Sequence, residues 1–127
     1  MNLNEYQELA QRTAQITKTG KDKILNGCMG LNGESGECID LLKKHMFQGH
    51  ELNAVKLMDE CSDVLWYVAE LATGLGVSLE SVARHNIDKL RKRYPEGFSS
   101  ERSINREEYS GGDGIERKNI PSSGNQV

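Results

Sequence analysis

The sequence predicts an all-α fold in a single domain, and three observations support this prediction. Only two prolines occur, Pro95 and Pro121, so the chain before residue 95 lacks the strongest helix breaker. Apolar residues in that stretch recur three and four positions apart, which is the helical period rather than the alternation of strands. A chain of 127 residues is long enough for one domain with a modest core and too short for two. We therefore expect four helices before residue 95.

The first helix is predicted from about Leu3 to Ile16, because apolar and small residues recur there at helical spacing. These positions are Leu3, Tyr6, Leu9, Ala10, Thr13 and either Ile16 or Thr17. Asn2 or Asn4 is the expected N-cap, since asparagine accepts hydrogen bonds from the free N–H groups of a first turn. Gly20 closes the link to the next helix.

The second helix is predicted over roughly Asp22 to Phe47, with an apolar stripe along one side. The stripe consists of Ile24, Cys28, Leu31, Cys38, Leu42 and Met46. Four glycines weaken the intrinsic helicity of this segment, so packing must hold it. They are Gly27, Gly30, Gly33 and Gly36. The last two lie beside acidic residues, where a missing side chain would let a ligand or a neighbouring helix approach the backbone.

A third helix is predicted near Leu52 to Leu75, after a polar turn. It is apolar nearly all round, which implies burial on more than one side and favours a partner chain. Tyr67 lies near Glu60 and Asp63 on the helical wheel, where it lines a site or packs between helices; packing is the commoner role.

The fourth helix is predicted over roughly Leu79 to Arg93, with Ser78 as its N-cap. It must stop before Pro95, because the residue preceding proline disfavours the α region. Beyond Phe98 the chain becomes rich in serine, glycine and charge, with too few apolar residues for another core element. We expect residues 1–98 to form the domain and residues 99–127 to form a polar, partly flexible tail.

Composition excludes several classes of protein. Only 36% of the residues are hydrophobic and 6% aromatic, so the core of one monomer is thin and self-association would help. The net charge of −3 argues against nucleic-acid binding through a basic face. No apolar run of about 18 residues predicts a membrane span, and the N-terminus lacks a signal-peptide pattern, so the expected location is cytoplasmic. Three cysteines without a C-x-x-C pattern favour reduced, buried thiols over disulfides or a zinc site.

Two carboxylate pairs share one spacing, Glu34-x-x-Glu37 and Glu60-x-x-Asp63. Each pair lies on one helical face, at the same offset from its apolar stripe. If the second and third helices pack antiparallel, the four carboxylates converge, and their repulsion requires a cation. Oxygen-only ligands suit Mg²⁺, or Mn²⁺, better than Zn²⁺. The alternative for either pair taken alone is a solvated helix face, which is the commoner case.

The end of the fourth helix carries an amide and two cations on one face, Asn86, Lys89 and Arg93. An amide donor with lysine and arginine suits phosphate oxygens, because arginine forks bidentately and lysine acts as a point charge. The alternative is a basic turn that complements the helix dipole, and this explanation is preferred for Arg91 and Lys92.

The ordered blocks of this chain resemble those of MazG-type nucleoside triphosphate pyrophosphohydrolases, within the all-α NTP pyrophosphatase superfamily. The blocks are Gly33-Glu34-Ser-Gly-Glu37, Glu60-Cys-Ser-Asp63-Val-Leu-Trp-Tyr, Asn86-x-x-Lys89 and Arg93-Tyr-Pro-Glu-Gly-Phe98. The resemblance covers roughly Leu3 to Phe98. It implies a four-helix MazG-like bundle, completed by assembly into homodimers or homotetramers. It also implies hydrolysis of an NTP or dNTP between the α- and β-phosphates, giving the monophosphate and pyrophosphate, as in house-cleaning of nucleotide pools.

The resemblance assigns roles residue by residue. The implied Mg²⁺ ligands are Glu34, Glu37, Glu60 and Asp63. The implied substrate-binding residues are Asn86 and Lys89, with Arg93 and Tyr94 as softer assignments. A carboxylate not fully engaged with metal could serve as general base; Glu37 is the first choice by position, and the sequence does not rank it above Glu34.

Other functions remain open at this point. A dUTP/dCTP-type pyrophosphatase and a phosphoribosyl-ATP pyrophosphohydrolase would share the acidic quartet. From a different class, the chain could be a metal-stabilised helical interaction module without turnover. Replacing Glu37 and Glu60 by glutamine separates the classes, because an enzyme loses hydrolysis while keeping its assembly.

Overall fold

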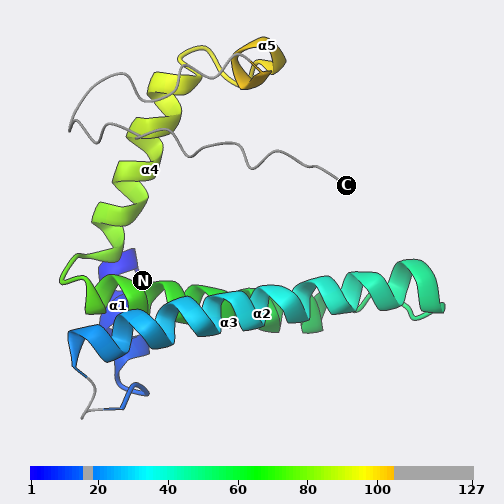
Figure 1. The fold of residues 1–127 in the computed structure, drawn as a ribbon, viewed down its shortest axis with the longest axis horizontal. Coiled ribbons are helices and arrows are strands. Elements are labelled where there is room, and N and C mark those ends of the chain that lie inside the picture. Colours follow the sequence, from blue (N-terminus) through cyan, green and yellow to red (C-terminus); the bar gives the residue numbers. More distant parts are fainter. Residues whose placement is uncertain (16–18, 105–127) are drawn as a thin grey trace, which may run out of the picture.

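The computed structural model describes residues 1–15 and 19–104, and helices are the only regular elements in these ranges. They are α1 (Leu3–Gln11), α2 (Gly20–Gln48), α3 (Ala54–Gly74), α4 (Leu79–Arg93) and α5 (Ser100–Ile104) (Figure 1). The predicted all-α fold is therefore confirmed, and the short α5 is an addition. The part of the predicted tail from residue 105 onward lies outside the described residues.

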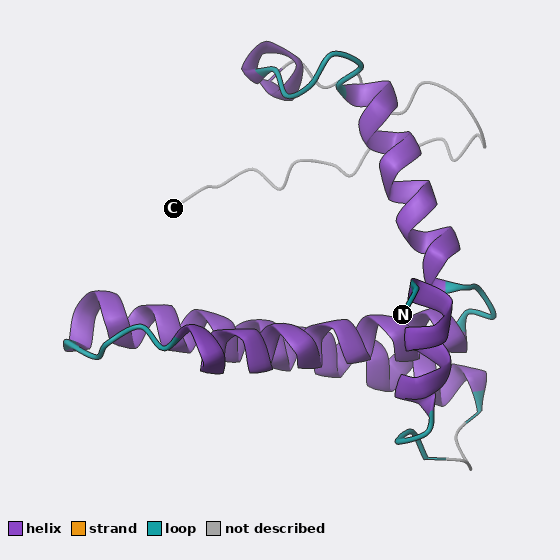
Figure 2. Ribbon diagram, turned by 180° about the vertical axis from the view of Figure 1, so that it is seen from behind, coloured by secondary structure: helices purple, strands orange, loops and turns teal. Residues whose placement is uncertain are grey.

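Helices α2 and α3 form a long antiparallel hairpin, which is the main body of the chain in both views (Figures 1 and 2). Two glycines of α2 let the helices approach closely. A Cβ atom at Gly27 would lie 2.8 Å from Cβ of Leu71, and one at Gly30 would lie 2.1 Å from the ring of Tyr67. Packing against α3 therefore holds this glycine-rich helix together, as the sequence predicts.

Helix α1 lies across the end of the hairpin where α3 finishes (Figure 2). Asn2 is its N-cap, in a reciprocal capping box with Glu5. The helix ends at Gln11 rather than near Ile16, and the reason lies at Ala10. Its carbonyl accepts hydrogen bonds from Trp66 Nε1 at 3.1 Å and from Thr13 Oγ1 at 2.8 Å, which replace the bond that a further helical turn would make. Residues 16–18, including the predicted end of this helix, lie outside the described residues.

The core lies where α1, α3 and α4 meet. Ala10, Ala69 and Leu79 are buried together, and Trp66 and Tyr6 pack against them. Polar contacts reinforce the junction, because Gln7 of α1 donates to Thr73 Oγ1 and to the Val77 carbonyl, and its Oε1 accepts from the Leu79 N–H.

A buried charge, Glu70, also lies beneath α1, with no solvent-exposed surface. Lys23 of α2 reaches it, with Nζ 3.4 Å from Oε2, and also donates to Gln11 Oε1 at 2.7 Å. One polar cluster thus joins α1, α2 and α3. The apolar pattern of the third helix gives no sign of this buried carboxylate.

Helix α4 begins at the predicted N-cap, Ser78, whose side chain accepts from the Ser81 N–H. It contacts α1 and α3 near its start, where Asn4 bonds to the side chain and backbone of Glu80. A turn with Gly76 at a φ of 70° separates it from α3. From this turn α4 extends away from the hairpin (Figure 1).

Much apolar surface remains exposed on the hairpin. Six of its large apolar side chains are between 62% and 77% exposed: Met29, Ile39, Met46, Phe47, Val55 and Met58. The cysteines are free, but Cys28 and Cys61 are exposed and Cys38 is only half-buried, so the expectation of buried thiols is wrong. Within the described ranges, no helix combines the length and apolar character that crossing a membrane requires.

Candidate functional site

Three of the four predicted carboxylates converge across the hairpin, and Asp63 lies outside this group. Glu34 and Glu37 lie one turn apart on α2, and Glu60 faces them from α3. One carboxylate oxygen from each of these three residues lies within 4.8 Å of the others. Glu34 and Glu60 are half-buried and Glu37 is exposed. The antiparallel pairing of α2 with α3 thus brings together three of the four carboxylates that the matched spacing predicts to converge.

The fourth predicted ligand, Asp63, interacts electrostatically with this group. Burial raises the pKa of Glu34 above its ordinary value, and the charges of Glu37, Asp63 and Glu60 raise it further. Asp63 is exposed, and its charge also contributes, after burial, to raising the pKa of Tyr6 on α1. The four carboxylates therefore repel one another, and a cation among them would relieve the repulsion.

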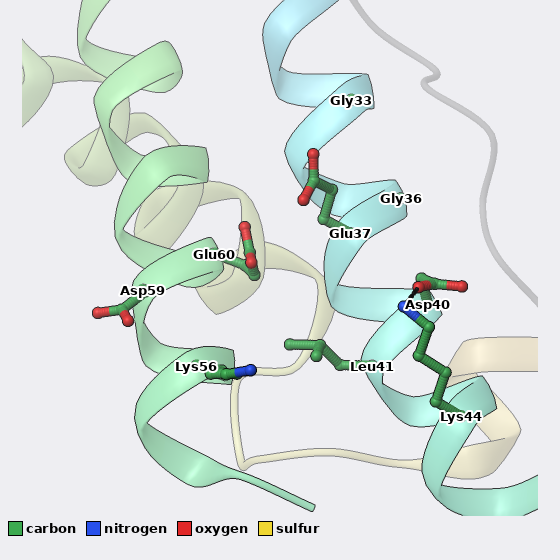
Figure 3. A pocket seen from close by; sticks show the side chains of 9 residues that line it. All are labelled: Gly33, Gly36, Glu37, Asp40, Leu41, Lys44, Lys56, Asp59 and Glu60. Carbon is green, nitrogen blue, oxygen red and sulfur yellow. Dashed lines mark ion pairs between the residues drawn. The ribbon is translucent and has the colours of Figure 1, made fainter. Parts of the chain in front are cut away.

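A cavity of about 520 Å³ opens beside these carboxylates (Figure 3). It is lined by Gly33, Gly36, Glu37, Asp40, Leu41, Lys44, Lys56, Asp59 and Glu60. A Cβ atom at Gly33 or Gly36 would meet nothing within 4 Å, in contrast to Gly27 and Gly30. The glycines of α2 therefore fall into two groups: one packs against α3, and the other leaves the backbone open at the cavity.

Two lysines of this cavity are residues that sequence reasoning missed. Lys56 extends from α3 toward Leu41 of α2, and Lys44 lies along α2 with its ammonium group on Asp40 (Figure 3). Helical spacing alone could have placed Lys56 near the site, because it lies four residues before Glu60 and therefore on the same face of α3. A lysine and a glutamate at that spacing usually form an ordinary surface pair, so the sequence alone did not single them out.

The predicted substrate-binding residues lie elsewhere, along α4. Asn86 is exposed, whereas Lys89, Arg93 and Tyr94 are half-buried, and the ring of Tyr94 lies 5.5 Å from that of Phe98. Because α4 extends away from the hairpin, one chain does not bring these residues to the carboxylates (Figures 1 and 2).

Tyr67 and Trp66 have packing roles. The Tyr67 ring covers Gly30 and meets the Trp66 ring edge-on, with centroids 5.0 Å apart. Trp66 donates from Nε1 to the Ala10 carbonyl and to Thr13 Oγ1, and so holds α1 against α3. Packing, the commoner of the two roles considered for Tyr67, accounts for its position.

The donor set fits a hard divalent cation. Within the described residues, the clustered ligands are carboxylates without histidine or cysteine, and oxygen-only sets suit Mg²⁺ or Mn²⁺. His45 and His50 instead contact each other at the end of α2, where His45 Nδ1 lies 2.8 Å from the His50 carbonyl. A site that combines clustered carboxylates with two lysine ammonium groups can hold a cation together with an anionic ligand.

Comparisons with known proteins agree with this chemistry. Residues 25–98 match the family model of the MazG nucleotide pyrophosphohydrolase domain. The chain is also similar to the Gene 37 protein of Mycobacterium phage L5, with 35% identity over 105 residues that cover 76% of this chain and 92% of that protein. No solved structure matches the chain. The matched segment contains the three clustered carboxylates, Asp63 and the residues noted on α4.

Proposed function

Because the chain belongs to the MazG nucleotide pyrophosphohydrolase family, we propose that it hydrolyses nucleoside triphosphates between the α- and β-phosphates. The products are a nucleoside monophosphate and pyrophosphate, and the role is the removal of unwanted nucleotides from the pool. The observation that carries this proposal is the convergence of Glu34, Glu37 and Glu60 beside a cavity that also holds two lysines.

The carboxylates would hold Mg²⁺, or Mn²⁺ in its place. Glu34, Glu37 and Glu60 supply three oxygens close enough to share one ion, and Asp63 adds a fourth negative charge to the group. When bound, the cation neutralises phosphate charge and acts as a Lewis acid. Burial, and then the charges of Glu37, Asp63 and Glu60, raise the pKa of Glu34, and a bound cation would offset the part that comes from these charges.

Side chains of the protein itself supply the remaining steps of the reaction. In the proposed reaction a water oxygen forms a bond to the α-phosphorus, and the bond from that phosphorus to the bridging oxygen breaks. The electron pair leaves with pyrophosphate, and a carboxylate takes the proton of the water. Glu37 is the first candidate for this base because it lines the cavity, and Glu34 is the second. Lys56 lines the same cavity and would neutralise charge on the phosphates.

The residues on α4 complete the site in an assembled homodimer or homotetramer. Two observations support this part of the proposal: the hairpin exposes large apolar side chains, and α4 extends away from the carboxylates of its own chain. In the assembly, Asn86, Lys89, Arg93 and Tyr94 would reach the nucleotide in the site of a second copy. Arginine and lysine would bind phosphate oxygens there, and the amide would donate to the substrate.

A nucleotide panel tests the proposed function. The purified chain is incubated with Mg²⁺ and each of the common NTPs and dNTPs, with dUTP, phosphoribosyl-ATP and nucleotides carrying oxidised or deaminated bases added. We expect pyrophosphate and the monophosphate in equal amounts, and the relative rates identify the substrate. Release of inorganic phosphate instead of pyrophosphate would refute cleavage between the α- and β-phosphates.

A further inference from the structure

Both lysines of the cavity lie on the same side of Glu37 and Glu60. Glu37 and Glu60 lie toward the Gly33 end of the cavity, whereas Lys44 and Lys56 lie toward the turn of the hairpin (Figure 3). Lys44 follows Glu37 by about 10 Å along the axis of α2, and Lys56 precedes Glu60 by about 6 Å along α3. Because the helices are antiparallel, both offsets point in the same direction. The cationic groups of the cavity therefore lie on the side of the hairpin turn, where Asp40 pairs with Lys44, and Asp59 is the remaining carboxylate of the lining.

The two lysines differ in the direction that their helices give them. Side chains on a helix lean toward its N-terminus, so Lys44 leans back toward Glu37, while Lys56 leans toward the hairpin turn. The position of the Lys44 ammonium group agrees with this rule, because Nζ lies 2.5 Å from Oδ2 of Asp40, one turn before it. Lys44 is therefore the lysine whose ammonium group is displaced toward the carboxylate end.

Asp40 has a second cationic partner, so Lys44 can leave Asp40 and bind another anion. Lys43 pairs with Oδ1 of Asp40 while Lys44 pairs with Oδ2. The side chains of Lys43 and Lys44 are 52% and 43% exposed, so neither pair is locked away from water. If Lys44 moves to another anion, Asp40 keeps Lys43, and no carboxylate is left without a cation. Exchange of an exposed ion pair of this kind costs little free energy.

We propose that Lys44 binds the β- and γ-phosphates of the substrate, moving from Asp40 to the phosphates while Lys43 holds Asp40. This inference rests on the proposed function and adds the orientation of the nucleotide. The α-phosphate lies at the carboxylates, the pyrophosphate half points toward the hairpin turn, and the nucleoside lies toward Gly33. The orientation agrees with the open backbone there, since a Cβ atom at Gly33 would meet nothing within 4 Å. As the bond to the α-phosphorus breaks, negative charge collects on the leaving pyrophosphate, where an ammonium group stabilises it.

The test compares two lysines that share one carboxylate. Lys44→Ala removes the lysine that lines the cavity, and Lys43→Ala is the matched control, because each variant leaves Asp40 with one partner. We expect Lys44→Ala to raise KM for the preferred triphosphate and the inhibition constant of pyrophosphate about fivefold to tenfold, as befits one exposed charged contact. Lys44→Arg should keep both constants within about threefold of the wild type, because it keeps the charge. Lys43→Ala keeps the cavity lysine and should raise both constants less than Lys44→Ala does, because Lys44 must then leave the exposed Asp40 carboxylate to water, at a small cost in free energy.

Inhibition by the nucleoside monophosphate supplies the discriminating measurement, because this product lacks the β- and γ-phosphates. We expect its inhibition constant to be the same in the wild type and in Lys44→Ala. Equal weakening of monophosphate and pyrophosphate by Lys44→Ala would overturn the orientation, and equal pyrophosphate inhibition of Lys44→Ala and Lys43→Ala would overturn the role of Lys44. Either result leaves the proposed function standing, provided that the wild type releases pyrophosphate; a wild type that does not release it refutes the proposed function itself.

Discussion

Glu70 is a buried residue whose burial costs free energy and whose polar cluster joins three helices. Its carboxylate has no exposed surface, Lys23 is its only cationic partner among the described residues, and Oε1 has no hydrogen-bond partner within the same ranges. Burying a charge is expensive unless a partner compensates it. The stability of the junction between α1, α2 and α3 therefore depends on Lys23.

Replacing Lys23 by methionine should destabilise the chain by about 3 kcal/mol, because it leaves the buried Glu70 carboxylate without a cation. Adding Glu70→Leu to that variant should recover most of the loss, since an apolar pair of similar size fits the same space. Urea unfolding followed by circular dichroism measures both changes. A single variant that loses less than about 1 kcal/mol would show that Glu70 is not held as a charge.

Single substitutions at the carboxylates separate catalysis from folding. Glu37→Gln and Glu60→Gln should each lower the hydrolysis rate at least about 100-fold, because each removes a proposed metal ligand while keeping the size of the side chain. Their helix content and assembly should match the wild type. Glu51→Gln, in the exposed turn after α2, is the control and should hydrolyse normally. If the glutamine variants lose assembly and the wild type shows no turnover, the chain is an interaction module instead.

Sequence reasoning at this scale succeeded where a residue's role follows from its own helix. The convergence of Glu34, Glu37 and Glu60 could be predicted, because equal spacing on two antiparallel helices places them at equal offsets, but the same reasoning included Asp63, which lies outside the cluster. The roles of Lys44 and Glu70 could not be predicted. Glu70 depends on Lys23 of the neighbouring helix, and the proposed role of Lys44 depends on which part of α3 lies across the cavity; periodicity in one segment carries no information about that alignment.

At the scale of elements, α2 combines two kinds of glycine that can be told apart by experiment. Gly27→Ala should destabilise the chain by about 1–2 kcal/mol, because the added Cβ collides with Leu71 and outweighs the gain of about 1 kcal/mol in helix propensity. Gly36→Ala should instead stabilise it by up to about 1 kcal/mol, because its Cβ meets nothing within 4 Å. Thermal unfolding of the two variants checks the contrast. Equal destabilisation would mean that Gly36 is also packed.

The final turns of α2 should respond to acid through Asp40. Hydrogen bonds from Lys43, and then from Lys44, lower the pKa of Asp40 from 3.8 to about 2. A carboxyl group with a lowered pKa stabilises the fold above its ordinary pKa, and this contribution is lost as the pH falls from 3.8 toward about 2. The melting temperature of the wild type should therefore exceed that of Asp40→Asn at pH 5, and the difference should shrink as the pH falls through about 2. A difference that stays constant over this range would contradict the role of these ion pairs.

The boundaries of the helices show where local signals are sufficient. Ser78 is the predicted N-cap of α4, Asn2 is the one of the two predicted candidates that caps α1, and α4 has the predicted bounds, because caps and prolines act locally. Helix α1 ends early because Trp66, a residue of another helix, takes the Ala10 carbonyl. The direction of α4 was likewise beyond prediction, since an amphipathic pattern defines the faces of a helix but not the angle at which it leaves a turn.

At the scale of the whole molecule, exposed apolar surface indicates assembly. Large apolar side chains on both helices of the hairpin are mostly exposed, and so much apolar surface usually marks an interface. We expect light scattering at micromolar concentration to give the mass of two or more chains of 14.2 kDa. A stable monomer that hydrolyses nucleotide at full rate would contradict the assembled site.

A double variant tests whether assembly and activity are linked. Val55 and Met58 lie one turn apart on α3 and are 62% and 64% exposed. Replacing both by lysine should weaken the assembly and lower hydrolysis with it, because the residues on α4 would then lose the carboxylates of a second copy. Lys43→Ala, on the exposed face of α2, should leave the mass unchanged. Full activity of a monomeric Val55→Lys/Met58→Lys chain would show that α4 acts within its own chain.

The contact between Gly30 and Tyr67 has a further consequence for the carboxylates. Glu37 lies seven residues after Gly30, and Glu60 lies seven residues before Tyr67, so the contact is two turns, or about 10 Å, from each acid. Because this contact fixes the register of α3 along α2, it also fixes where the two acids lie relative to each other. Sliding α3 along α2 by one residue would rotate Glu60 by about 100° and remove it from the cluster. The geometry of the cluster is thus set at a distance, by a position where α2 has no side chain.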